Sequence, residues 1–110
     1  MLTNIDQLDL NQRYTYKDYL NWQFDQMVEL IKGKLFKMTP APGSRHQQVS
    51  SRLLQPLLNH FQDSKCEVFH APFDVRLPLP KEQDELNTVV QPDICIVCDP
   101  EKIDDQGCLG

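Results

Sequence analysis

The sequence contains no long hydrophobic run. Within its 110 residues, no apolar stretch approaches the ~20 residues that a helix needs to cross a membrane, so we expect no membrane partner. The first residues, Met1 to Asp6, form neither a basic nor an apolar region, and we expect no secretory signal and a cytoplasmic chain. With 40% hydrophobic and 25% charged residues, the composition is typical of a soluble globular domain.

Positive charge is also in short supply. The chain has 11 Lys and Arg residues against 16 Asp and Glu residues, which gives a formal net charge of -5. This balance argues against a protein that coats nucleic acid by bulk electrostatic attraction. It leaves nucleic-acid chemistry at a metal ion open, because acidic metal ligands lower the net charge without altering a binding groove.

Cysteine occurs at only four positions, Cys66, Cys95, Cys98 and Cys108. Without an export signal, we expect all four to be reduced thiols rather than a disulfide framework. Cys95 and Cys98 form a C-x-x-C within an apolar run that predicts a strand, where residues three apart face opposite sides about 10 Å apart. This distance excludes a shared metal and exceeds the ~7 Å limit for a bridge between these two residues. The sequence therefore favours structural thiols over a metal or redox site.

The chain begins with an irregular segment followed by a short helix. Residues 1–13 are polar, with only scattered apolar positions, and predict a lead-in without regular structure. A capping box, Thr15-x-x-Asp18, comes next and is followed by apolar side chains. This pattern predicts a short helix over residues 16–24 that covers one face of a sheet.

Period-two alternation predicts strands in two further places. Over residues 28–38 the alternation is interrupted by Lys32 and Gly33, which predicts two short strands joined by a tight hairpin with a positive φ at Gly33. The segments 66–70 and 73–77 alternate in the same way and are separated by a proline. They form either one long bent strand or two short ones.

A second capping box, Ser44-x-x-Gln47, predicts the start of the main helix. The apolar residues that follow recur at helical spacing, which is typical of a helix packed against a core. They are Val49, Leu53, Leu54, Leu57, Leu58 and Phe61. Pro56 lies within this pattern and has no amide proton to donate, so we expect a kink near Gln55.

The last strong pattern is the apolar run from Val89 to Cys98. It is apolar on both faces, which predicts a central strand covered from both sides, and residues 106–110 are expected to be loop. Asp93, in Gln91-Pro92-Asp93, lies at the entrance of the buried part of this strand. An unpaired buried charge is costly, so this carboxylate needs a partner or a metal. From these residues alone, a turn or cap role and a metal-ligand role both stay open.

Several linked segments resemble one bacterial family. They are Tyr14-Thr15-Tyr16-Lys17-Asp18-Tyr19-Leu20, Glu29-Leu30-Ile31-Lys32-Gly33, Pro40-x-Pro42 with Ser44-Arg45-His46, Ala71-Pro72-Phe73-Asp74-Val75-Arg76-Leu77, Val90-Gln91-Pro92-Asp93-Ile94 and Gly107-x-x-Gly110. Together they cover residues 14–110 and resemble the Uma-two family of restriction-endonuclease-like proteins, within the PD-(D/E)XK nuclease superfamily. The resemblance implies an α/β (α+β) fold of the restriction-endonuclease type, with a mixed sheet, a long core helix and an N-terminal β-hairpin.

The resemblance also implies a function. Pro92-Asp93 matches the PD half of the nuclease signature, with Asp93 as a ligand of Mg²⁺ or Mn²⁺ in an endonuclease that hydrolyses the phosphodiester bonds of DNA. Glu29 matches an acidic position and His46 a histidine, which implies an accessory active-site acid and a positioning or proton-shuttling residue. Without the family, Glu29 is equally a solvated strand-start carboxylate, and His46 a surface histidine at a helix start.

One part of the family pattern cannot be assigned in these 110 residues. In the family, a strand with a second acidic ligand and a helix with a basic residue follow the Gly-x-x-Gly loop. We therefore expect residues 14–110 to be the N-terminal part of a single domain that lacks the C-terminal part of its sheet and is inactive by itself. The alternative is a non-catalytic remnant or interaction module that keeps the fold. An uncovered sheet edge predicts a homodimer, and DNA is the expected partner of the complete protein.

Overall fold

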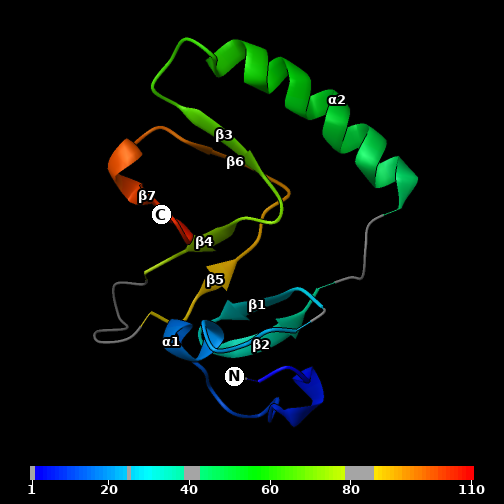
Figure 1. Cartoon of the computed structure of the whole chain (residues 1–110), viewed down its shortest axis with the longest axis vertical. Helices are drawn as coiled ribbons and strands as arrows, with labels where there is room; N and C mark the ends of the chain where they lie inside the picture. The colour runs from blue at the N-terminus through cyan, green and yellow to red at the C-terminus, as the bar shows by residue number, and fades with distance from the viewer. Residues whose placement is uncertain (1, 25, 39–42, 79–85) are drawn as a thin grey trace. The chain divides into compact units, whose positions relative to one another are not determined.

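The computed structural model describes residues 2–24, 26–38, 43–78 and 86–110. These residues form one long helix, shorter helical turns and a set of short strands, so the α+β class expected from the sequence is confirmed (Figure 1). The Pro40-x-Pro42 segment lies outside the described residues. Within them, no helix is long and apolar enough to cross a membrane.

The chain folds as two compact units. Unit one contains residues 1–40 and 76–90, and unit two contains residues 41–75 and 91–110. The elements of unit one are a 3-10 turn (Ile5–Gln7), α1 (Tyr16–Tyr19), β1 (Val28–Ile31), β2 (Lys34–Lys37) and β5 (Val89–Val90). Those of unit two are α2 (Ser44–Phe61), β3 (Glu67–His70), β6 (Ile94–Val97), a 3-10 turn (Pro100–Lys102), β7 (Ile103–Asp104) and β8 (Gly107–Leu109). The strand β4 (Asp74–Arg76) begins in unit two, and its last residue belongs to unit one.

The helix α1 has the predicted capping box but is shorter than expected. The Thr15 hydroxyl accepts a hydrogen bond from the Asp18 N–H, and the Asp18 carboxylate accepts one from the Thr15 N–H. The helix ends at Tyr19 rather than at residue 24. Leu20 is the C-cap and still has αR geometry, and the chain leaves the helical turn by Gln23, whose N–H bonds to the Leu2 carbonyl at 2.7 Å. Tyr19 packs against the core of unit one, which fits the covering role predicted for this helix.

The predicted hairpin is confirmed and builds the core of unit one. β1 and β2 pair antiparallel, and the turn between them has a positive φ at both Lys32 (51°) and Gly33 (82°). β5 pairs with the other edge of β1, where Leu30 lies opposite Val89. Both of these side chains are fully buried, so β1 is the central strand of this unit. Leu30 forms a buried hydrophobic cluster with Tyr14, Val28 and Leu35.

The long helix α2 differs from the sequence expectation in its start and its burial. Its N-cap is Gly43, with no side-chain cap bond, so the capping box expected at Ser44 is wrong. The helix continues through Pro56. No residue of α2 is buried, and Leu53 is 53% exposed, so its expected role as a core helix is also wrong. Helical periodicity reports an apolar face, but it does not report how far that face is covered. Leu54, Leu57 and Phe61 are half-buried, whereas Val49, Leu53 and Leu58 are exposed.

The run from Val89 to Cys98 is two strands rather than one central strand. β5 and β6 are separated by Gln91, Pro92 and Asp93, because proline donates no ladder hydrogen bond and the chain bends at Asp93. β6 pairs antiparallel with β3 in a two-stranded sheet, so among the described strands it is an edge strand. The segments 66–70 and 73–77 are two short strands, which decides between the alternatives left open by the sequence.

The end of the chain is ordered as a hairpin rather than a loop. β7 and β8 pair antiparallel, and β8 lies next to β4 in the sheet order. Gly107 begins β8 with a φ of 139°, and a Cβ at this position would clash with the Asp74 carbonyl oxygen. Only glycine allows β8 to approach β4 this closely.

Two of the four cysteines are bonded, so the expectation of four reduced thiols is wrong. Cys66 and Cys98 form a disulfide. They immediately flank the register pair Glu67 and Val97, so the antiparallel pairing of β3 with β6 brings them together. Cys95 and Cys108 take no part in a disulfide, and Cys95 is not bridged to Cys98, as the strand geometry predicted.

Candidate active site

Asp93 lies in the short break between β5 and β6. Its carbonyl accepts a hydrogen bond of 3.0 Å from the Ala71 N–H, at the end of β3. This bond fixes the main chain of Asp93 to the end of β3, while the Asp93 side chain remains 64% exposed. The carboxylate is therefore accessible to solvent rather than buried at a strand entrance, which removes the burial cost considered for it above.

His46 lies in the first turn of α2 and reaches Asp93. The distance between His46 Nε2 and Asp93 Oδ2 is 3.2 Å, although the two residues are 47 positions apart in the sequence. Both belong to unit two, and the His46 side chain is 45% exposed. The structure therefore brings together two of the three residues that the sequence singled out.

The contact between His46 and Asp93 fixes the proton arrangement of the imidazole. An ionised carboxylate only accepts hydrogen bonds, so Nε2 carries the proton that it donates to Asp93. In the neutral ring, Nδ1 is then the basic atom. A histidine oriented in this way by a carboxylate can accept a proton from a water molecule or return one to a leaving group.

Glu29 lies in the other unit, on β1. It stands opposite Phe36 in the hairpin register and is half-buried, so it is not simply a solvated carboxylate at a strand start. Its role as an accessory acid stays a prediction. Sequence reasoning did not single out Ala71, whose N–H holds the main chain of Asp93. The sequence feature that could have pointed to Ala71 is the Ala71-Pro72 segment, which is part of the family resemblance.

The donor set at Asp93 and His46 is compatible with a hard divalent metal but is small. Mg²⁺ binds through one or two carboxylates and keeps several of its waters, and imidazole is an accepted ligand for softer transition metals. Asp93 offers an exposed carboxylate, whereas His46 Nε2, 3.2 Å away, is engaged in its hydrogen bond to Asp93 and in this arrangement cannot bind a metal. Among the described residues, no group of three or more His, Cys, Asp and Glu side chains could hold a metal. Asp93 by itself thus fits the role of a single carboxylate ligand of an ion that keeps most of its waters.

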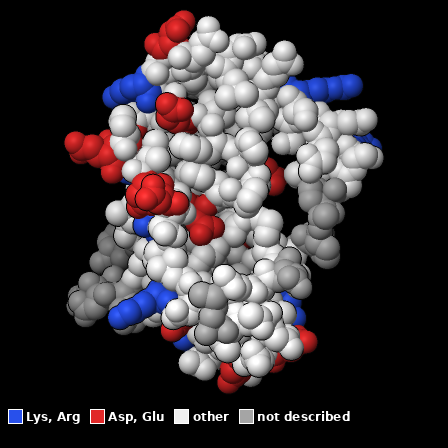
Figure 2. Space-filling view, viewed as in Figure 1, with Lys and Arg blue, Asp and Glu red and all other residues white. Residues whose placement is uncertain are grey.

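The charge on the surface does not point to bulk attraction of nucleic acid. On the face shown in Figure 2, the Lys and Arg side chains stand apart from one another, in keeping with the net charge of -5. Any specific binding of a polyanion would therefore rest on local contacts rather than on the field of the whole chain.

In a comparison with protein families, residues 16–108 match the family Uma2, described as "Putative restriction endonuclease". The matched range contains α1, the hairpin, α2 and the His46–Asp93 contact. A comparison with curated proteins finds no match to the chain.

Proposed function

Because the chain belongs to the Uma2 family of putative restriction endonucleases, we propose that it supplies active-site residues of a metal-dependent DNA endonuclease. The observation that carries this proposal is the contact of 3.2 Å between His46 and Asp93. It joins the residue that matches the nuclease signature to a proton-transfer group, within the segment that matches the family.

The proposed reaction is hydrolysis of a phosphodiester bond. A water oxygen attacks phosphorus, the bond from phosphorus to the leaving oxygen breaks, the water loses a proton and the leaving oxygen gains one. His46 Nδ1 is the proposed acceptor of the proton from water, and Asp93 holds the ring through Nε2. A bound Mg²⁺ or Mn²⁺ would stabilise the charge that develops on the phosphate.

Asp93 is the proposed protein ligand of that metal, with His46 beside it. Glu29 stays in the proposal as an accessory acid from unit one. Because the described residues supply only a small donor set, we propose that the 110-residue chain binds metal weakly and does not cleave DNA by itself. A longer family member that adds further acidic and basic residues would be active. The partner of that longer protein would be DNA. Its proposed location is the cytoplasm, where a disulfide such as Cys66–Cys98 is rare.

A Mn²⁺ titration tests the metal site directly. Calorimetry on the 110-residue chain should give a weak association that falls at least tenfold in Asp93→Ala. The matched control is Asp105→Ala, which removes an exposed carboxylate from the turn between β7 and β8. Equal Mn²⁺ affinities of the wild type and Asp93→Ala would contradict the metal assignment.

A cleavage assay on supercoiled DNA tests the catalytic proposal. In a longer family member, the substitutions equivalent to His46→Ala and Asp93→Ala should each reduce Mn²⁺-dependent cleavage by about 10²-fold or more. The control is the equivalent of His60→Ala, since His60 lies exposed on the same helix. If the longer protein binds DNA without any cleavage, the non-catalytic alternative replaces this proposal.

The proposal also includes a homodimer formed through β6. Of the described strands, β3 alone pairs with β6, so the opposite edge of β6 carries open N–H and C=O groups. Ile96 on this strand is 39% exposed. Two copies of β6 related by a two-fold axis can pair antiparallel, because such a pairing is self-complementary.

A further inference from the structure

The Cys66–Cys98 disulfide closes one end of the small sheet that leads to the candidate site. In the antiparallel register of β3 with β6, the bond lies at one end of the ladder. Beyond the other end of the ladder, the Ala71 N–H holds the Asp93 carbonyl at 3.0 Å. The same two strands therefore connect the disulfide to the main chain of Asp93.

Cys66 also connects the disulfide to α2, the helix that carries His46. The Ser64 hydroxyl donates a hydrogen bond of 2.9 Å to the carbonyl of Phe61, the last residue of α2, and accepts one of 3.1 Å from the Cys66 N–H. β3 contacts α2 and pairs with β6, and Figure 1 shows it between these two elements. The bond to Cys98 therefore ties the far end of β6 to the turn that follows α2.

The ladder between β3 and β6 is short. Of the described strands, only β3 pairs with β6, and it does so over four residue pairs. A sheet of two strands is marginally stable in water, and β6 follows β3 only after a long intervening segment, so the pairing also has to overcome the entropy of loop closure. The disulfide removes much of this entropic cost, because it already closes the loop, with a sequence separation of 32.

The disulfide is accessible to small thiols, because Cys98 is exposed and Cys66 is half-buried. A thiolate of a dithiol attacks Cys98 Sγ, the bond between the two cysteine sulfurs breaks, and Cys66 leaves as a thiolate that takes up a proton. The second thiol of the reagent then attacks the reagent's own sulfur in the mixed disulfide, which releases Cys98 as a thiol and leaves the reagent as a cyclic disulfide. The dithiol thus supplies the two electrons and two protons of the reduction, and an oxidised reagent of the same class reverses it.

We propose that the Cys66–Cys98 disulfide is a redox switch for the candidate site. In the oxidised chain, β6 is held against β3 and Asp93 stays within reach of His46. In the chain reduced by a dithiol, β6 separates from β3 and this contact is lost. Exposed disulfides are the labile and regulatory ones, and those in a reducing compartment are usually transient. The regulatory meaning of the switch rests on the proposed function, whereas the change in the structure of the site does not.

Amide hydrogen exchange followed by NMR tests the switch on the chain itself. The N–H of Ala71 reports the anchor of Asp93, and the N–H of Tyr14, which bonds to the Gly33 carbonyl at 2.8 Å, reports unit one. Reduction with dithiothreitol should accelerate exchange at Ala71 by about tenfold or more and leave Tyr14 unchanged, and oxidised dithiothreitol should restore slow exchange. Thiol titration of the unfolded chain should give two thiols before reduction and four after it.

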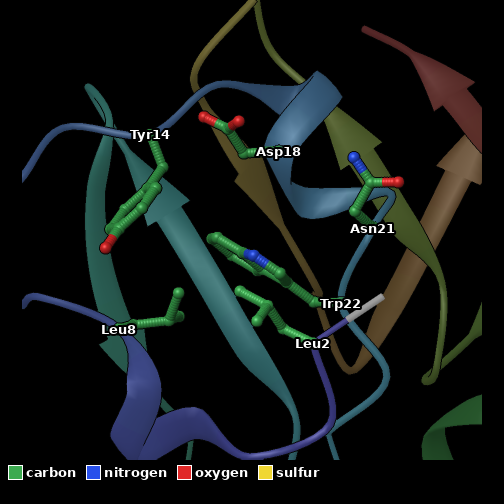
Figure 3. Close-up of a pocket in the computed structure, with 6 residues that line it drawn as sticks. All are labelled: Leu2, Leu8, Tyr14, Asp18, Asn21 and Trp22. Atoms are coloured by element: carbon green, nitrogen blue, oxygen red, sulfur yellow. The ribbon is translucent and has the colours of Figure 1, made fainter.

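Trp22 provides a second control within unit one. It is the only tryptophan of the chain, and its ring meets Tyr14 edge-on with ring centroids 5.2 Å apart. Figure 3 shows it in a cavity of about 450 Å³ that is lined by Leu2, Leu8, Tyr14, Asp18, Asn21 and Trp22. The indole N–H signal of Trp22 should keep its position on reduction. A shift of this signal together with fast exchange at Tyr14 would mean that reduction unfolds the whole chain, which overturns a switch confined to unit two.

Variants separate this disulfide from the other cysteines. The double variant Cys66→Ser with Cys98→Ser should show fast exchange at Ala71 with or without dithiothreitol. The matched control Cys95→Ser removes a cysteine of β6 that is in no disulfide, and it should respond to dithiothreitol as the wild type does.

The exchange rates of the wild type decide the proposal even if the double variant does not fold. Equal exchange at Ala71 in the oxidised and reduced wild type overturns it. The Mn²⁺ titration described above, carried out on the oxidised chain, tests the proposed function separately, since the exchange at Ala71 is measured without metal.

Discussion

Replacing Gly107 by alanine should uncouple the C-terminal hairpin from β4. A Cβ at residue 107 would overlap the Asp74 carbonyl oxygen and lie 2.9 Å from the carbonyl carbon. Both atoms belong to the main chain and cannot rotate away, so β8 has to move by about 1 Å or more to restore a normal contact. The φ of 139° adds backbone strain of about 1–3 kcal/mol in any residue other than glycine.

The expected loss of stability follows from these two effects. Separation of β8 from β4 weakens one or two ladder hydrogen bonds, each worth about 1 kcal/mol. Together with the strain, Gly107→Ala should lower the free energy of unfolding by about 3 kcal/mol. This is a large fraction of the ~5–15 kcal/mol that stabilises a typical domain. For a chain of this size, the melting temperature should fall by about 10 °C or more.

The measurement is urea denaturation followed by circular dichroism, with Gly43→Ala as the matched control. Gly43 is the N-cap of α2, and a Cβ there meets nothing within 4 Å. Its replacement should cost at most about 1 kcal/mol, through the poorer capping by alanine. A Gly107→Ala chain as stable as Gly43→Ala would refute the close approach of β8 to β4.

Two further predictions concern unit two. Reduction of the Cys66–Cys98 disulfide, or its removal by Cys66→Ser, should lower the free energy of unfolding by about 3 kcal/mol, because the bond closes a loop with a sequence separation of 32. Equal melting curves with and without a reductant would contradict this prediction. If two copies pair through β6, light scattering after size exclusion should give a dimer mass for the wild type and a monomer mass for Ile96→Lys. The control Leu53→Lys changes an equally apolar, exposed residue on α2 and should remain dimeric, whereas a monomeric wild type would remove the homodimer from the proposal.

Local signals in the sequence predicted local structure well. The capping box of Thr15 and Asp18 and the positive φ of Gly33 depend on neighbouring residues alone, and both are present. The capping box predicted with Ser44 as N-cap is absent, because the N-cap lies one residue earlier, at Gly43. Glycine can itself adopt the extended conformation of an N-cap.

Properties that depend on distant parts of the chain could not be predicted in the same way. The apolar stripe of α2 reveals which face is hydrophobic, but not whether anything covers it, and Leu53 proved to be exposed. Pro92 indicated a break between two strands, since proline has no N–H for a ladder hydrogen bond. The apolar residues on both sides of Pro92 nevertheless led to the prediction of a single strand. Cys66 and Cys98 became neighbours only through the register of β3 with β6.

The candidate site shows the same division between residues and contacts. Asp93 and His46 were each singled out through the family resemblance, whereas their mutual contact depends on how α2 lies against the strands of unit two. A separation of 47 positions carries no periodic signal that would have linked them. Trp22 was visible only as an apolar residue, because a cavity is a property of the folded chain.

Asp93 makes its structural contact and its proposed chemical contact through different atoms. The main-chain carbonyl holds the residue to Ala71, and the side chain reaches out to His46. Any amino acid at position 93 offers the same carbonyl, so the anchoring bond tolerates substitution while the carboxylate does not. In evolutionary terms, a single replacement can remove the proposed metal ligand and leave the fold intact. Under the proposed function, active and inactive descendants of one ancestor can therefore share this scaffold and diverge by one codon.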